Sequence, residues 1–226
     1  MKEFAWSYSA LTTYELCPKK YFHLYVAEKG TPERVADADS SFAADGKIIH
    51  DAFRKRVIDK TPFPLPMRNF EKVAVKFANA PGEKHAEMKL AINRKFEPVG
   101  YFEKDVFVRV VIDLAIVQQK TAIVVDWKTG KVKDDPTQNA LNAAVLSRWM
   151  PEVDTFKTLF VWVNSNQLTP HSYTVPQFTA VWTDLLPRVA KIEEAKKTTT
   201  FPAKKNGLCG WCPVKQCPHF IERSQD

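Results

Sequence analysis

The sequence of 226 residues lacks several features that would place it in a common class of protein. No apolar run is long enough to span a bilayer. The first ten residues, MKEFAWSYSA, are too short and too polar for a secretion signal. We therefore expect a soluble cytoplasmic protein that makes no contact with a membrane.

Motifs of two large enzyme classes are also missing. There is no G-x-x-x-x-G-K-[S/T] sequence, so the chain is not itself an ATP-driven helicase. No Ser-His-Asp constellation of a nucleophilic hydrolase is visible, and no internal repeat indicates a solenoid. With 45% hydrophobic residues, the length suffices for one domain with a sizeable core.

The charge balance is modestly basic, at +7. Such an excess fits a polyanionic partner such as DNA, and it fits a solvated basic surface equally well. Lys19 and Lys20 are one local concentration of charge.

Cysteine is scarce but clustered. Three of the four cysteines, Cys209, Cys212 and Cys217, lie in the stretch LCGWCPVKQC, and Cys17 lies near the other end of the chain. Disulfides are a poor explanation in a chain without an export signal. A C-x2-C pair with a third cysteine nearby indicates a metal or cluster site instead. Because Pro18 breaks a helix, we expect Cys17 at a helix end.

Hydrophobic periodicity predicts helices around a central group of strands. The predicted strands are 86–92, 105–117, 121–127, 156–164 and 168–175, and the predicted helices after the N-terminal one are 41–58, 67–82, 136–150 and 176–197. The three residues 118–120 between two of the strands suggest a hairpin. This order predicts an α/β fold with a mixed sheet.

The end of the strand IVVDWK carries the chemistry. Asp126 and Lys128 are two residues apart, so they project from the same face of the strand. Asp113 is an acid within the neighbouring apolar strand, and a buried carboxylate is unfavourable unless it is paired or bound to metal. If the two strands pair, the two carboxylates approach each other and favour Mg²⁺ or Mn²⁺. The alternative is a salt bridge of either acid with Lys128.

Further residues complete a longer pattern. The order is Gly46-x-x-x-His50, then Glu87, Asp113, Asp126-Trp127-Lys128-Thr129-Gly130, and a helix that begins near Gln138. This pattern, with the N-terminal SALTTYELCPKKYF, resembles the RecB-like branch of the PD-(D/E)XK nucleases, in particular its iron–sulfur exonucleases of the CRISPR-adaptation type and of phages. The resemblance implies a restriction-endonuclease-like core over about residues 41–200.

The resemblance also implies roles for the residues. His50, Asp113, Asp126 and the carbonyl of Trp127 would hold the metal, and Glu87 would complete or orient that set. Lys128 would orient water or stabilise charge at the phosphorus, and Gln138 would position the strand being cut. In this branch the helix usually carries a tyrosine four residues after the glutamine, where this chain has Asn142.

By the same resemblance, the four cysteines would bind a [4Fe–4S] cluster, with structural zinc as the alternative. They would join residues 1–25 to 201–226 within a single nuclease domain of residues 1–226. We expect Lys19, Lys20, Lys131 and Lys133 to contact DNA.

The function implied is a Mg²⁺- or Mn²⁺-dependent deoxyribonuclease, most plausibly an exonuclease acting on single- or double-stranded DNA with free ends in recombination, repair or phage DNA processing. It would work in the bacterial or phage-infected cytoplasm, with a recombination or replication protein as a possible partner. The alternative is a non-catalytic DNA-binding or end-processing adaptor within a larger complex.

Overall fold

The structure, a computed structural model, describes residues 4–35, 41–133 and 135–222 of the chain. The chain divides into two compact units. The first comprises Met1–Ala5 and Phe42–Asp184, and the second Trp6–Ser41 and Leu185–Asp226. In the described part of the chain, no helix is long and apolar enough to cross a membrane. The expected division into a core of 41–200 and a cysteine part of 1–25 plus 201–226, which includes residues outside those described, stays a prediction.

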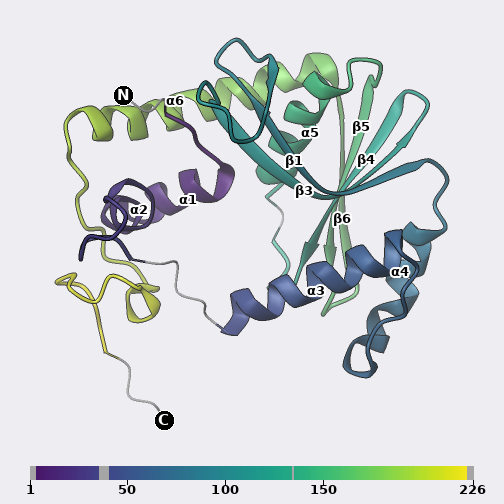
Figure 1. The fold of residues 1–226 in the computed structure, drawn as a ribbon, viewed down its shortest axis with the longest axis horizontal. Coiled ribbons are helices and arrows are strands. Elements are labelled where there is room, and N and C mark those ends of the chain that lie inside the picture. The colour runs from purple at the N-terminus through teal and green to yellow at the C-terminus, as the bar shows by residue number, and fades with distance from the viewer. Residues whose placement is uncertain (1–3, 36–40, 134, 223–226) are drawn as a thin grey trace. The chain divides into compact units, whose positions relative to one another are not determined.

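A six-stranded sheet forms the centre of the first unit (Figure 1). Its strands are β1 (Glu83–Ile92), β2 (Pro98–Val99), β3 (Val108–Gln118), β4 (Thr121–Lys128), β5 (Thr155–Trp162) and β6 (Gln167–Thr174). They lie in the order β2-β1-β3-β4-β5-β6, and only β4 and β5 run parallel. The predicted α/β fold with a mixed sheet is therefore confirmed.

The hairpin between β3 and β4 holds Asp113 and Asp126 in register. Gln118 pairs with Thr121, and Gln119 takes the left-handed conformation, with φ of 53°, that a tight turn requires. Val125 pairs with Leu114 one residue before Asp126, so the register carries Asp126 toward Asp113. The expected pairing of these two strands is thus present.

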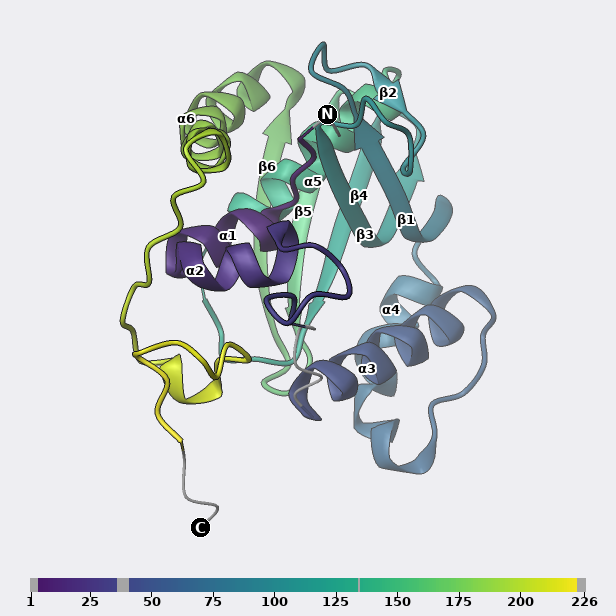
Figure 2. The same cartoon turned by 60° about the vertical axis from the view of Figure 1, so that its left-hand side comes forward.

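Two layers of helix cover the sheet (Figure 2). They are formed by α3 (Ser41–Ile58), η2 (Leu65–Phe70), α4 (Glu71–Ala78) and α5 (Thr137–Trp149). The helix predicted within 67–82 ends before Pro81-Gly82 as expected, but its predicted start is wrong, because residues up to Phe70 form the 3₁₀ helix η2 and α4 begins at Glu71.

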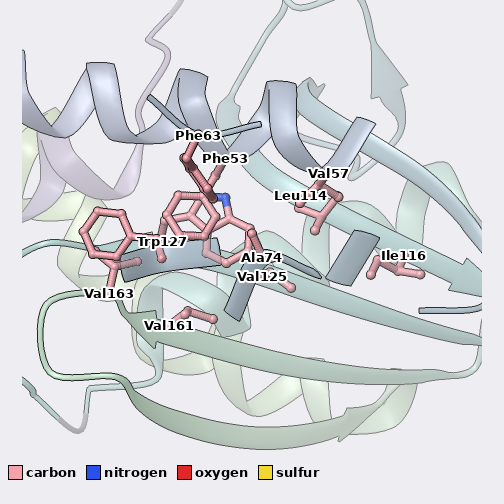
Figure 3. Close-up of a cluster of buried hydrophobic side chains, with 11 residues drawn as sticks. Phe53, Val57, Phe63, Ala74, Leu114, Ile116, Val125, Trp127, Val161 and Val163 are labelled. Atoms are coloured by element: carbon pink, nitrogen blue, oxygen red, sulfur yellow. The ribbon is translucent and has the colours of Figure 1, made fainter. Parts of the chain in front are cut away.

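The core lies between α3, η2, α4 and one face of the sheet. Phe53 of α3 stacks on Trp127 of β4, with ring centroids 4.3 Å apart (Figure 3). Side chains alternate along a strand, so Val125 and Trp127 face this core while Asp126 and Lys128 face the opposite way. On that opposite face, α5 contacts the strands and presents Gln138 to both residues. The buried tryptophan therefore fixes the position of the polar pair that flanks it.

The second unit brings the two ends of the sequence together. It contains α1 (Tyr8–Leu16), α2 (Pro18–Tyr21), η1 (Phe22–Val26), most of α6 (Phe178–Lys197) and η4 (Cys209–Trp211). Cys17 ends α1 and immediately precedes Pro18, which confirms its predicted place at a helix end. The carboxylate of Glu15 pairs with Arg188 at 2.7 Å, and the ring of Tyr21 stacks with that of Phe201.

Candidate metal centre

Three side chains from separate elements converge on one point of the first unit. His50 of α3, Glu87 of β1 and Asp113 of β3 each offer a ligand atom, and these atoms all lie within 4.8 Å of one another. Nδ1 of His50 is 3.3 Å from Oδ1 of Asp113. Imidazole nitrogen and carboxylate oxygen together form a donor set suited to a divalent cation such as Mn²⁺.

Glu87 reaches this point with an unusual backbone. Its φ is 53°, the left-handed conformation, in the interior of a β-strand. The residues on either side keep the ladder, since Ala86 pairs with Leu114 and Met88 with Ile112. Glu87 therefore sits opposite Asp113 without an inserted residue. A left-handed residue other than glycine stores strain on the order of 1 kcal/mol, and such strain gathers at functional sites.

Asp126 is the most deeply buried acid of the site, with 4% of its surface exposed. Burial, followed by the charge of Asp113, raises the pKa of Asp126 to about 6, although Lys128 and His50 act in the opposite direction. Its Oδ2 lies 2.7 Å from Nζ of Lys128 as an ion pair, outside the angles of a hydrogen bond. Asp126 is not part of the group that converges within 4.8 Å.

Gln138 links Asp126 to Lys128. Its Nε2 donates to Oδ1 of Asp126, and its Oε1 accepts from Nζ of Lys128, each at 2.9 Å. The salt bridge that the sequence left open as an alternative is thus present between Asp126 and Lys128. It leaves the convergence of His50, Glu87 and Asp113 unexplained.

The backbone of Trp127 borders both groups of residues. Its N–H donates to Oδ2 of Asp113 at 2.9 Å. Burial alone would lower the pKa of His50, but the hydrogen bond and charge of Asp113, the charge of Asp126 and a hydrogen bond to the Trp127 backbone raise it overall. The pKa of Glu87 is raised, first by burial and then by Asp113. The site thus has an excess of acidic groups that a cation would relieve.

Two contacts of the site could not be foreseen from the sequence. The ring of Phe160 lies 5.3 Å from Nζ of Lys128, because the parallel register places Phe160 beside Asp126. Nδ2 of Asn164 donates to the carbonyl of Thr129 at 2.8 Å, which fixes the chain as it leaves β4. No motif signals either contact, since both depend on the pairing of β4 with β5.

The four cysteines line one pocket of the second unit. Cys17 and Cys209 are buried, Cys212 and Cys217 are partly buried, and all four thiols are free of disulfides. Burial raises the pKa of Cys212, and Cys17 and Cys217 add to that effect. Backbone N–H groups of Lys204 and Asn206 donate to the sulfurs of Cys17 and Cys209, at 3.4 and 3.3 Å.

The lysines expected to contact DNA fall in both units. Lys20 lines the cysteine pocket, and Lys19 is partly buried beside it in the sequence. Lys131 and Lys133 are exposed on the segment that follows β4. Asn142, which replaces the family's tyrosine, is buried in α5.

Comparison with known proteins assigns a family to this arrangement. A family model described as the PD-(D/E)XK nuclease superfamily matches residues 5–218. A search of curated proteins finds no significant match to the sequence. Among solved structures, a crystal structure of SSO0001 is similar, with a TM-score of 0.47 and 15% identity, covering 98% of this chain and 89% of that one.

Proposed function

We propose that this chain, which belongs to the PD-(D/E)XK nuclease superfamily, is a metal-dependent DNA nuclease of the RecB-like kind that degrades DNA from free ends. The convergence of His50, Glu87 and Asp113 beside the Asp126–Lys128 pair carries this proposal. Membership of the superfamily implies a nuclease, and DNA is its expected substrate. Action on ends rests on the resemblance of the motifs alone.

The residues fit a divalent cation. His50, Glu87 and Asp113 supply one nitrogen and at least two oxygen donors, and Asp126 adds a buried carboxylate whose Oδ2 pairs with Lys128. Mg²⁺ or Mn²⁺ bound there would polarise the phosphodiester and acidify a water molecule. Asp126 and the Trp127 carbonyl are the further ligands that we propose.

The chain's own groups orient the reaction. Lys128 is held by Asp126, Gln138 and the ring of Phe160, so its ammonium is in place before substrate arrives. We assign to Lys128 the orientation of the attacking water and the stabilisation of negative charge on the phosphate. Gln138 positions Lys128 and Asp126 through its two hydrogen bonds. That Gln138 also positions the DNA strand being cut stays a prediction.

The test is a cleavage assay with Mn²⁺ on end-labelled linear DNA and on closed circular DNA. We expect the linear DNA to be shortened from its ends and the circles to survive. Asp126→Asn and Lys128→Ala should each lower the rate at least a hundredfold. Glu83→Gln is the matched control, because it removes an exposed carboxylate from the same strand as Glu87.

Cleavage of the closed circles would support the assignment as a nuclease and refute the assignment as an exonuclease. Wild-type protein that binds DNA and cuts neither substrate would refute the enzyme and favour the non-catalytic adaptor. Capture of a recombination or replication protein by the folded wild-type chain would then support the adaptor.

We further propose that Cys17, Cys209, Cys212 and Cys217 bind a [4Fe–4S] cluster. Four thiols from both ends of the chain line one pocket, and two of them accept backbone hydrogen bonds of the kind that stabilise cluster sulfurs. No three of these sulfurs lie within 4.8 Å of one another among the described residues, whereas tetrahedral zinc needs spacings of about 3.8 Å.

Zinc therefore requires the sulfurs to move closer together, and the choice of the cluster rests on the family resemblance. Anaerobically purified protein should be coloured, with broad absorbance near ~400 nm and bound iron and sulfide. Colourless protein with one zinc per chain would refute the cluster and support the structural zinc site.

A further inference from the structure

An open pocket of about 450 Å³ lies in the first unit and has no role in the metal centre. Segments from α3, η2 and the ends of β4 and β5 line it, including Ile48, Ile49, Met67, Phe70, Thr129 and Asn164. Phe70 belongs to the buried core, and Ile49 and Met67 pack against that core, so the floor of the pocket is fixed. Ile48 is 57% exposed and forms part of the rim.

The pocket lies next to the metal centre along two elements. Ile48 is two residues from His50, about 3 Å along the helix axis, and its side chain leaves the helix on a different side from that of His50. Thr129 follows Lys128 directly, about 3 Å along the chain. Because side chains alternate, Thr129 faces away from Asp126 and Lys128. The pocket is therefore reached from the carboxylates by passing around the end of β4.

Cations whose charge is not balanced by the nearest acids flank the pocket in the sequence, because Asp51 pairs with Lys55 and Glu71 with Arg56. Three exposed cations lie within two residues of a lining side chain. They are Lys47 in α3, Arg68 in η2 and Lys131 after β4. The hydroxyl of Thr129 and the amide of Asn164 add a polar edge to an apolar floor. An apolar slot with one polar edge and a cationic rim matches the flat faces, polar edge and phosphates of a nucleotide.

We propose that this pocket binds the nucleobase of a nucleotide adjoining the phosphate that is cut. This inference rests on the proposed nuclease function. A base inside a duplex cannot enter such a pocket, so the strand must be unpaired there. The substrate class that follows is single-stranded DNA or a frayed DNA end. An apolar protein segment would fill the floor but would leave the three cations without a purpose.

The experiment uses end-labelled single-stranded oligonucleotides in which one abasic site is moved along the strand. Wild-type protein with Mn²⁺ should pause at the phosphate that adjoins the abasic site, with the rate there about tenfold lower, as expected for losing one base contact. Ile48→Ala and Met67→Ala should reduce this penalty to less than about threefold, because base and pocket no longer interact. Phe102→Ala, an 84% exposed apolar side chain outside the pocket, should keep the full penalty.

Failure of the inference differs from failure of the proposed function. If intact oligonucleotides are cut but the abasic penalty is absent, or is equal in wild type and both pocket variants, the base pocket is refuted and the nuclease stands. If no oligonucleotide is cut, the nuclease fails. The pocket is then tested by the fluorescence of a 2-aminopurine oligonucleotide that binds the protein in the presence of Ca²⁺. A fluorescence change that Ile48→Ala abolishes supports the pocket, and one that it leaves unchanged refutes it.

Discussion

Replacing Asp126 by asparagine should separate the stability of the fold from its chemistry. The side chain is buried, and its burial, with the charge of Asp113, raises the pKa to about 6 from an ordinary 3.8. This rise in pKa corresponds to about 3 kcal/mol. It is the free energy by which the ionised carboxylate of Asp126 destabilises the metal-free fold at neutral pH. Asparagine keeps the shape and can accept from Gln138, but it gives up the ion pair with Lys128.

The raised pKa already includes the attraction of Lys128, and Lys128 is 29% exposed and retains Gln138 as an acceptor, so the loss of the ion pair takes little from this gain. We expect Asp126→Asn to stabilise the metal-free chain by about 1–3 kcal/mol at pH 7.5, a rise of roughly 2–10 °C in Tm. The same variant should lose Mn²⁺-dependent cleavage. A gain in stability with a loss of activity is typical of a group retained for function.

The sign of the pH dependence follows from the raised pKa. The protonated form of Asp126 stabilises the fold fully below about pH 3.8, and this contribution is lost as the pH rises through about 6. The advantage of Asp126→Asn over wild type should therefore be small near pH 4.5 and reach its full size above pH 7.

The assay is thermal unfolding in EDTA at both pH values, followed by addition of Mn²⁺. Added Mn²⁺ should raise the Tm of wild type more than that of Asp126→Asn. Asp105→Asn, at an exposed position, is the control and should show no such gain. An Asp126→Asn variant that is less stable than wild type in EDTA at pH 7.5, or an advantage independent of pH, would refute the reasoning.

Three other predictions address the metal centre and the cysteine pocket. Glu87→Gly should leave the stability of the metal-free fold unchanged or raise it by up to about 1 kcal/mol, because glycine relieves the left-handed strain. Glu87→Val should lower that stability. Urea titrations compare the two variants, and equal losses of stability would refute strain at this position. Phe160→Leu should lower the cleavage rate two- to fivefold, because a cation–π contact of about 0.5–1 kcal/mol with Lys128 is lost, and because Phe160 is buried it should also lower stability by about 1 kcal/mol. Single-turnover kinetics measure the rate, and an unchanged rate excludes the contact. Cys17→Ser should expose the second unit to limited proteolysis and remove visible absorbance, and a coloured, resistant variant would exclude Cys17 as a ligand.

The sequence predicted the elements of the site better than its details. Alternation along a strand was enough to put Asp126 and Lys128 on one face, and the hairpin at 118–120 was enough to pair β3 with β4. Both arguments are local. Contacts that depend on the order of strands in the sheet were beyond such reasoning, and the ring of Phe160 beside Lys128 is the clearest case.

The backbone of Glu87 shows a second limit. Its strand was predicted from a period of two, which assumes extended residues throughout. Periodicity records where side chains are apolar and contains no information on the sign of φ. A glutamate in the left-handed conformation contradicts local preference, and only the surrounding strands hold it there.

The ion pair between Asp126 and Lys128 does not by itself distinguish a structural from a catalytic role, and its neighbours favour the catalytic role that we propose. A structural pair would be complete with Gln138 and would gain nothing from a third acid. Here Asp113 lies close enough to raise the pKa of Asp126, and the strained Glu87 adds a further carboxylate beside His50. The crowding of these carboxylates destabilises the metal-free fold, and a divalent cation would relieve it. Gln138 and Lys128 compensate Asp126, but they leave Glu87 and Asp113 with His50 as a converging set of donors. Such a surplus of acidic groups is what a metal-dependent site requires.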